Sequence, residues 1–425
     1  MPTFSELLKE LPDETREMLK GIWESLPPED RRDLQSIFTS FPSDPNLLKI
    51  LLRMSLSQFK LAFGQKRAVV VVGPANVGKS TLYNQMVRSK EDLAAVSPLP
   101  GTTRASQQAD AGLFTIVDTP GADAVGEVGE REKSLALEAA RKADFLIIMF
   151  DAIQGVKRTE QELFDELTGL KKPYVVVLNK IDLVKRDADK VVERAAADLR
   201  LKPEQVLPIS AKEGKQVGKV LMAIAAAEPS IVAALGSALP AYRWQLAWRA
   251  IASAASVAAV IALAPLPVVD FAPLVVTQSM MVLGIARIYN YKITLERARE
   301  LVATFGLGYL GRTVFQELSK LGGPPGWLLA AAVASSTTVG MGYAAAVWFE
   351  RGEKLSSQTL KAITRKVTGD LLGSMKSLGK RRPRRKELQE SIRSALENSP
   401  IADDPSALEQ DIASGSDGIA EEREE

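Results

Sequence analysis

The stretch that decides the fold is Gly73-Pro74-Ala75-Asn76-Val77-Gly78-Lys79-Ser80, which fits the pattern GxxxxGK[ST]. It follows the apolar run Ala68–Val72 and precedes a helix-like segment, the context in which this pattern forms a phosphate-binding P-loop. The glycines let backbone amides wrap around phosphate oxygens, and the helix N-terminus adds partial positive charge. Lys79 is expected to reach the β- and γ-phosphates, and the Ser80 hydroxyl to bind Mg²⁺. The expected nucleotide-binding residues of this segment are Gly73, Asn76, Val77, Gly78, Lys79, Ser80 and Thr81.

Composition supports phosphate chemistry by what it excludes. The 425 residues are 46% hydrophobic and 25% charged, which is ordinary for globular protein, and they include no Cys and no His. Disulfide frameworks, thiolate nucleophiles, Ser-His-Asp triads and His/Cys metal sites are therefore excluded. Catalysis must rely on Lys, Asp, Ser, Thr, backbone amides and a hard metal ion. The first residues lack the apolar run of a secretory signal, so a cytosolic N-terminus is expected.

Residues 66–228 alternate short apolar runs with helical patterns. The runs are Ala68–Val72, Leu113–Val117, Phe145–Phe150, Tyr174–Leu178 and Val206–Ile209. Continuous apolar runs separated by helices predict a mostly parallel sheet that is covered by helices on both faces. We therefore expect an α/β domain over residues 66–228.

A second motif, Asp118-Thr119-Pro120-Gly121, follows the apolar run Leu113–Val117. An Asp at this strand end can hold Mg²⁺ through a water molecule, while the Gly121 amide can contact the γ-phosphate and sense its loss. Asp118 is therefore a candidate Mg²⁺ residue, and Gly121 joins Lys79 among the candidate catalytic residues.

Two further motifs at strand ends indicate which base is bound. In Asn179-Lys180-Ile181-Asp182, the Asp182 carboxylate can accept hydrogen bonds from both N1–H and N2–H₂ of guanine, which adenine cannot satisfy. Asn179 is expected to brace the P-loop, and the aliphatic stem of Lys180 to pack over the base. Ser210-Ala211-Lys212 follows the last apolar run and can offer a backbone amide to guanine O6.

The four motifs, in this order, resemble the translation-factor-like P-loop GTPases, and within them the Era/TrmE group. Pro100-Gly101-Thr102-Thr103-Arg104 matches the switch I signature of that group, in which the Mg²⁺-binding Thr precedes the Arg. The resemblance implies GTP and GDP as ligands and Thr103 as a metal ligand and catalytic residue, with Thr102 as the alternative. The signature usually continues with Asp, but here Ala105 follows, a departure that concerns local switch contacts.

Two positions refine the expected mechanism. Ala122 stands where Ras-like enzymes carry the Gln that orients the attacking water, so slow intrinsic hydrolysis is expected. In the Era/TrmE group, an Asn at the position of Asn76 marks enzymes that use K⁺ to stabilise charge between the phosphates. The resemblance therefore implies a K⁺ site at Asn76 and K⁺-stimulated hydrolysis, while an ordinary loop role for Asn76 is the alternative.

Residues 229–375 change character and form a predicted hydrophobic all-α domain. Its uncharged runs are Ala250–Val269, Phe271–Ala286 and Leu321–Phe349. The first run is long enough to cross a bilayer once, although its two prolines would shorten the helix. Four tryptophans flank the runs where interfacial belts would lie: Trp244, Trp248, Trp327 and Trp348. The alternatives are an Ala-rich soluble bundle or a re-entrant hairpin.

This half resembles the uncharacterised hydrophobic domain of YcjF-type proteins, over roughly residues 240–350. The residues that carry the resemblance are Pro265, Pro267, Asp270, Gln278, Met280, Ile285, Ala286, Tyr289, Thr338 and Gly340. The resemblance implies membrane association without naming a molecular activity.

The two ends of the chain are predicted to lie outside these domains. Residues 1–65 carry Leu-Pro, Leu-Pro and Phe-Pro pairs at 15-residue spacing and read as a helical cap on the next domain, or as a partner-binding hairpin. In the tail, residues 376–425, Lys376–Lys386 has a charge of +7 and Ile401–Glu425 a charge of −8. Disorder is expected over most of this tail.

Together these observations predict a bacterial-type GTP-binding protein that hydrolyses GTP as a molecular switch on the cytoplasmic face of a membrane. The expected partners are guanine nucleotide, membrane lipid, an unknown protein effector and a second copy bound through the GTPase or helical domain. One alternative is a soluble cytoplasmic GTPase associated with the ribosome or RNA through Lys380–Lys386. Another is a GTP-binding scaffold with negligible hydrolysis, which Ala122 permits.

Overall fold

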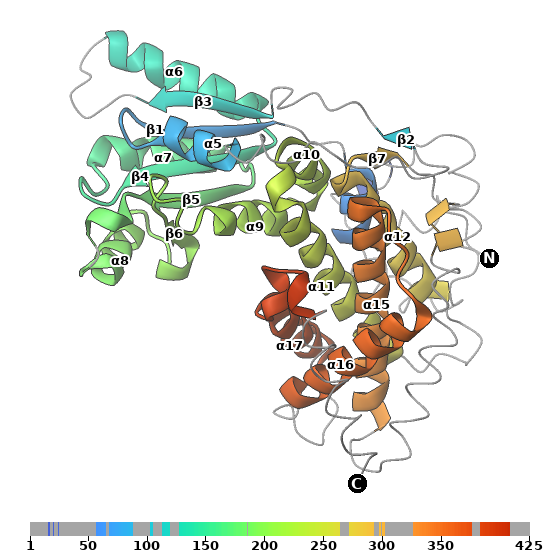
Figure 1. Ribbon diagram of the computed structural model, residues 1–425. Helices are drawn as coiled ribbons and strands as arrows, with labels where there is room; N and C mark the ends of the chain where they lie inside the picture. The colour runs from blue at the N-terminus through green and yellow to red at the C-terminus, as the bar shows by residue number, and fades with distance from the viewer. Residues whose placement is uncertain are drawn as a thin grey trace. The chain divides into compact units, whose positions relative to one another are not determined.

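Figure 1 shows the protein as a computed structural model. The structure describes residues 16–17, 20, 24, 57–64, 68–87, 103–104, 113–119, 127–184, 186–263, 272–292, 297–298, 300–301, 326–375 and 383–408. The chain divides into two compact units. The α/β unit comprises Gln65–Ala95 and Ser106–Arg243, and the helical unit comprises Met1–Gly64, Val96–Ala105 and Trp244–Glu425.

A parallel sheet forms the centre of the α/β unit (Figure 1). Its strands are β1 (Val69–Pro74), β3 (Phe114–Thr119), β4 (Phe145–Asp151), β5 (Tyr174–Asn179) and β6 (Val206–Pro208). They lie in the order β3-β1-β4-β5-β6, and β1 pairs with β3 and β4, β4 with β5, and β5 with β6, all in parallel. The five apolar runs are these strands, so the predicted fold class is confirmed.

Helices cover both faces of this sheet. The helices of this unit are α5 (Lys79–Val87), α6 (Glu127–Lys142), α7 (Arg158–Gly169), α8 (Ala188–Asp198), α9 (Val217–Ala227) and α10 (Val232–Ala238), with 3₁₀ turns η2 (Ile181–Leu183), η3 (Pro203–Gln205), η4 (Pro229–Ile231) and η5 (Pro240–Tyr242). Val70 and Val72 of β1 share one core with residues of α6, α7 and α8. Val69 and Val71 are equally buried on the opposite face, because successive side chains of a strand point to opposite sides. Both faces of β1 are therefore removed from water, as its unbroken apolar sequence requires.

The helical unit is built from five helices with described bounds, of which the first three are apolar and the last two carry many polar residues. They are α11 (Arg243–Ala262), α12 (Ala272–Ile288), α15 (Gly326–Arg351), α16 (Ser357–Met375) and α17 (Arg385–Glu397), followed by η7 (Pro400–Ala402). A short antiparallel ribbon pairs β2 (Thr103–Arg104) with β7 (Tyr291–Lys292). The pairing joins part of the predicted switch I signature to a segment that directly follows α12.

Small side chains allow the helices of this unit to approach closely. A Cβ atom at Gly342 of α15 would lie 2.5 Å from Cγ1 of Ile251 in α11. The buried hydroxyl of Ser335 donates to the carbonyl of Ala255 at 3.0 Å. Small residues of α15 therefore allow close helix packing, and the hydroxyl of Ser335 is satisfied inside the bundle.

Two helices of the described chain, Pro240–Ala262 and Gly326–Arg351, are long and apolar enough to cross a membrane. A third span is possible if the pair Val217–Ala227 and Pro229–Ala238, bent by 112°, counts as one. In the folded chain, 78% and 89% of the apolar windows of the first two helices are buried by protein. Their apolar surface is thus directed mainly toward other parts of the chain.

Three of the four flanking tryptophans do not form the belts that the sequence indicated. Trp244, Trp248 and Trp348 are buried, with exposed fractions of 6%, 1% and 6%. The indole nitrogens of Trp244 and Trp248 donate to backbone carbonyls of the C-terminal segment. Flanking positions on a hydrophobic run are equally suited to packing under a covering helix, and here that packing prevails.

Two predictions about the chain ends are corrected. Disorder is wrong for residues 383–408, because α17 and η7 form there and Leu388, Ile392 and Leu396 are buried. The cap interpretation is wrong for residues 57–64, because the helix at residues 57–63 and the following Gly64 belong to the helical unit and not to the α/β unit. The remaining residues of the predicted 15-residue repeat lie largely outside the described part of the chain.

The helix at residues 57–63 is held to α11 and α12 by polar contacts. Gln58 donates to the carbonyl of Ala250 at 3.4 Å, and Arg287 donates to the carbonyls of Leu61 and Gly64 at 3.0 and 2.5 Å. The α/β unit is therefore inserted in sequence between two helices, residues 57–63 and α11, which pack together in the other unit.

Candidate nucleotide-binding site

The P-loop joins β1 to α5 through a tight turn. Asn76 and Gly78 have φ angles of 63° and 101°, in the left-handed region. A Cβ atom at Gly78 would clash with Nδ2 of Asn179, and one at Gly73 would lie 2.5 Å from the carbonyl oxygen of Met149. The two glycines of the motif are thus required by the close approach of neighbouring strands and loops. The loop has the form that brings backbone amides against phosphate.

Lys79 begins α5 and is only 4% exposed. Its ammonium group donates to the carbonyls of Gly73 and Pro74 at 2.8 and 2.7 Å, both within the P-loop. Ser80 and Thr81 follow in the first turn of α5 and are exposed. A positive charge and two hydroxyls therefore lie at a helix N-terminus, where an anion is stabilised.

Asn179 connects two loops of the site through one buried amide. Its Nδ2 donates to the carbonyl of Val77 in the P-loop at 2.7 Å, and its Oδ1 accepts from the Ala211 amide at 2.9 Å. The side chain is 3% exposed. The predicted contact between Asn179 and the P-loop is present, and the same residue also fixes the loop that starts at Ser210.

The loop after β6 is closed by local hydrogen bonds. Ser210 is fully buried, its hydroxyl accepts from the Glu213 amide at 3.1 Å, and its backbone pairs with Lys215. Because the Ala211 amide is directed to Asn179, this loop is ordered around the Asn side chain. Lys212 is exposed at its tip.

Asp182 carries an unpaired buried oxygen. Its Oδ1 is removed from solvent and has no hydrogen-bond partner among the residues that the structure describes. A cavity of about 600 Å³ includes Asp182 and Leu183 in its wall, together with Ile153 and Gln154 from the loop after β4. A buried carboxylate oxygen without a donor is costly in a folded protein, and donors on a bound ligand would satisfy it. The N1–H and N2–H₂ groups of guanine fit this requirement.

Asp151 is a site residue that the sequence motifs did not reveal. Its Oδ2 accepts from the ammonium of Lys180 at 2.7 Å, and its Oδ1 accepts from the Ile153 amide at 2.8 Å. Lys180 has a φ of 66°, and its side chain is 28% exposed, compared with 7% for Asp151. The ion pair therefore fixes the direction of the Lys180 stem. The available signal was an acidic residue at the end of the apolar run Phe145–Phe150.

The remaining predicted site residues are placed only in part. Asp118 lies in β3, and its Cα is the register partner of Gly73, which puts its backbone beside the P-loop. Thr103 lies in β2, paired with β7 of the helical unit. Gly121 and Thr102 lie outside the described residues. Ser80 in the first turn of α5 follows the P-loop, and Asp118 lies beside that loop at the end of β3, while a shared Mg²⁺ and the role of Thr103 stay predictions.

Comparison with known families agrees with this geometry. Residues 68–180 match the family described as 50S ribosome-binding GTPase. These residues form a P-loop GTPase domain. Residues 238–372 match DUF697, a domain family of unknown function, so a separate hydrophobic domain follows the GTPase domain.

The GTPase domain is similar to the bacterial GTPase Der. It is 36% identical over 173 residues to GTPase Der of Symbiobacterium thermophilum, covering 39% of this chain and 35% of that protein. The identity to GTPase Der of Clostridium botulinum strain Loch Maree is 33% over 166 residues, covering 36% and 37%. The chain thus spans little more than a third of these relatives. The crystal structure of a single-residue variant of Aquifex aeolicus Era bound to GDP and AlF₄⁻ is 24% identical, with a TM-score of 0.30, and covers 46% of this chain and 67% of that one.

Proposed function

We propose that this protein binds GTP and hydrolyses it to GDP and phosphate as a molecular switch. The observation that carries the proposal is the buried Oδ1 of Asp182, which has no partner among the described residues. Asp182 belongs to the same strand-end motif as Asn179, and the side chain of Asn179 is hydrogen-bonded to the P-loop. The family match of residues 68–180 supports the same activity.

The residues of the P-loop would bind and orient the phosphates. Lys79 would exchange the carbonyls of Gly73 and Pro74 for β- and γ-phosphate oxygens, which offer stronger charge-assisted hydrogen bonds. A Mg²⁺ ion held by Ser80, Asp118 and Thr103 would neutralise charge on the transferred phosphoryl group. The Gly121 amide would detect the γ-phosphate, so that hydrolysis releases the segments around Gly121 and Thr103.

Base selection by Asp182 is tested by Asp182→Asn. Because the Asn amide can donate to the 2-oxo group of xanthine, the variant should lose at least about a hundredfold in GTP affinity and gain affinity for xanthosine triphosphate. Asp198→Asn is the matched control, since Asp198 lines the same cavity on α8. Titration with fluorescent nucleotide analogues measures both variants, and an unchanged GTP affinity in Asp182→Asn would refute the proposal.

A K⁺ requirement is the second part of the proposed mechanism. Asn76 lies in the P-loop with a positive φ and is exposed, so its amide oxygen is free to face a monovalent cation beside the phosphates. Ala122 provides no group that orients water. We expect faster single-turnover hydrolysis in KCl than in NaCl, and loss of this difference in Asn76→Ala. An unchanged K⁺/Na⁺ ratio in Asn76→Ala would remove Asn76 from the K⁺ site.

Membrane association through the helical unit is the third part. It is supported by two helices of spanning length and hydropathy. Fractionation of the expressed protein tests it: extraction by detergent but not by high salt supports the helices, and extraction by salt alone supports electrostatic attachment. Recovery in the soluble fraction with ribosomes would favour the alternative that the family description suggests, a ribosome-associated GTPase.

A further inference from the structure

The last described segment of the chain, residues 383–408, lies on the helical unit and is called the strap below. Leu388, Ile392 and Leu396 recur at four-residue spacing along α17 and are buried. Ile401 and Leu408 continue the buried row beyond the helix. A single apolar stripe therefore attaches the strap, while the other side of α17 faces solvent.

Two indole rings of α11 hold the end of α17. Trp244 donates from Nε1 to the carbonyl of Ile401 at 2.7 Å, and Trp248 donates to the carbonyl of Leu396 at 2.9 Å. The two rings stack with their centroids 5.8 Å apart. Both acceptors lie at or beyond the last turn of α17, where backbone carbonyls lack partners within the helix. The strap thus satisfies the polar groups of the rings that it covers.

A third aromatic residue makes the same kind of contact farther along the strap. The hydroxyl of Tyr343 in α15 donates to the carbonyl of Pro405 at 3.1 Å. Its ring meets Trp244 edge to face, with centroids 5.5 Å apart. Three amphipathic aromatic side chains therefore share one surface, and each has its polar atom bound to the backbone of the strap.

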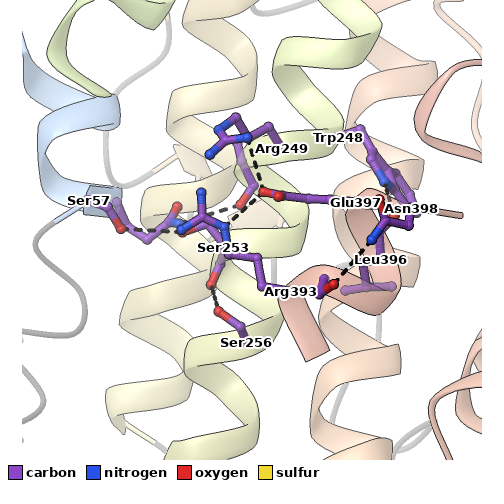
Figure 2. Close-up of polar contacts among 12 residues, drawn as sticks. Ser57, Trp248, Arg249, Ser253, Ser256, Arg393, Leu396, Glu397 and Asn398 are labelled. Carbon is purple, nitrogen blue, oxygen red and sulfur yellow. Dashed lines mark hydrogen bonds and ion pairs between the residues drawn. The ribbon is translucent and has the colours of Figure 1, made fainter. Parts of the chain in front are cut away.

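An ion-pair cluster holds the side of the strap, as Figure 2 shows. Glu397 accepts from Arg249 of α11 at 3.2 Å and from Arg393 of α17 at 2.8 Å. The side chains of Arg249 and Glu397 are 17% and 29% exposed. Removing Glu397 would leave a largely buried guanidinium without this partner, which weakens the closed arrangement more than loss of a surface pair would.

Both surfaces in this contact have the chemistry of a membrane interface. The strap starts with exposed Arg384, Arg385 and Lys386, so α17 combines basic groups with an apolar stripe, as helices that lie in headgroup regions do. The surface beneath presents Trp and Tyr, the residues enriched at that depth. It belongs in part to α11, a helix of membrane-spanning length.

We propose that the strap is releasable and that its release exposes α17 and the Trp244/Trp248 face of α11 for binding to an anionic lipid surface. The proposal rests on the membrane association proposed above. The basic start of the strap favours anionic lipid: Lys376–Lys386 holds seven bases and no acids, and such a cluster is attracted to an anionic surface. The apolar stripe of α17 and the Trp244/Trp248 face of α11 contact each other when the strap is closed. The same surfaces would contact lipid, so strap closure and lipid binding exclude each other.

The full-length Glu397→Gln variant tests the release. It should bind vesicles of phosphatidylglycerol and phosphatidylcholine about tenfold more tightly than the unmodified protein, because loss of the buried ion pair favours the open strap. Its tryptophan emission should shift to the blue when vesicles are added, because Trp244 and Trp248, exposed to water by the open strap, then enter the lipid interface. Glu390→Gln is the matched control, since it removes the same charge from the exposed side of α17, where Glu390 pairs with Lys386 at 3.7 Å. It should change binding less than about twofold.

A cross-link tests whether the strap must open before the protein can bind lipid. The chain contains no Cys, so Arg249→Cys with Glu397→Cys gives a unique pair for a flexible bis-maleimide. The linked protein should lose vesicle binding that the unlinked double variant retains. Equal binding of the two forms would overturn the strap proposal while leaving membrane association standing. If no form binds vesicles although tryptophan accessibility shows an open strap, both proposals fail. A dimer that forms on release in place of lipid binding would mean exchange of straps between copies, and would also overturn the lipid proposal.

Discussion

At the scale of single residues, the nucleotide site depends on side chains that bridge separate loops. Asn179 uses both ends of one amide to hold the P-loop and the loop after β6, while Asp151 fixes Lys180. Each bridge is buried or nearly so, and water therefore cannot replace a lost partner without rearrangement.

Asn179→Ala should weaken both the fold and nucleotide binding. The substitution leaves the Val77 carbonyl and the Ala211 amide without their partner, at a cost of about 2–4 kcal/mol in unfolding free energy. Urea denaturation and nucleotide titration measure the two effects. Asn84→Ala, on the exposed side of α5, serves as the control and should change neither. Stability equal to that of the unsubstituted protein would show that the bridge is not needed.

Glu160 gives the α/β unit a defined pH dependence. Burial raises the pKa of this carboxyl above its ordinary value, against the opposing hydrogen bond from the Lys157 amide. The folded state therefore holds a proton more tightly than the unfolded state. Stability from this group is full below the ordinary pKa of 4.5 and is lost as the pH rises through the folded-state value.

Glu160→Gln should remove that pH dependence. Because the Gln carbonyl can still accept from the Lys157 amide, the variant should match the parent near pH 4.5 and unfold at a higher temperature near pH 7. Thermal unfolding of the variant and the parent, recorded between pH 4.5 and pH 7, measures this difference in unfolding temperature. Glu162→Gln, which breaks an exposed ion pair with Arg158, should leave the pH profile of the parent unchanged.

At the scale of elements, the helix at residues 57–63 is attached by its C-terminal end. The Arg287 guanidinium donates to two carbonyls there, and Leu61 occupies the space that a side chain at Gly284 would fill. A planar fork with several donors suits two carbonyls better than an ammonium group.

Arg287→Ala should therefore destabilise the helical unit by about 3 kcal/mol, and Arg287→Lys by about half as much, because Lys can replace only part of the fork. Tryptophan-detected denaturation measures both. Lys366→Ala, which removes a surface pair with Asp370 on α16, should cost less than about 1 kcal/mol. An Arg287→Ala protein as stable as the Lys366→Ala control would mean that the Arg287 contacts do not hold this helix.

At the scale of the whole molecule, the two units can be observed separately. All five Trp residues fall within the ranges of the helical unit, and the α/β unit contains none. Tryptophan fluorescence thus reports one unit, whereas circular dichroism reports both.

GDP with Mg²⁺ should raise the unfolding temperature of the α/β unit alone. At a nucleotide concentration a hundredfold above Kd, the stabilisation is about 2.7 kcal/mol. Circular dichroism should then show a transition that moves with GDP, while the transition detected by tryptophan stays in place. ADP is the control and should move neither. One transition that shifts with GDP in both signals would show that the units unfold together.

The sequence by itself determined the fold class of the α/β unit and the places of its motifs. Short-range patterns carry that information: apolar runs of strand length give a buried parallel sheet, and the P-loop pattern fixes the turn between β1 and α5. Ser80, Asn179 and Asp182 could be named because strand ends in such a sheet meet at one edge.

The tertiary structure alone decided which surfaces cover one another. The pairing of Asp151 with Lys180, the attachment of residues 57–64 to the helical unit, and the burial of Trp244 and Trp248 under the strap all join residues far apart in the chain. An apolar run or an amphipathic stripe shows that its side chains must be buried away from water. It does not identify the partner, because the hydrophobic effect has no direction and protein and lipid can both provide that cover.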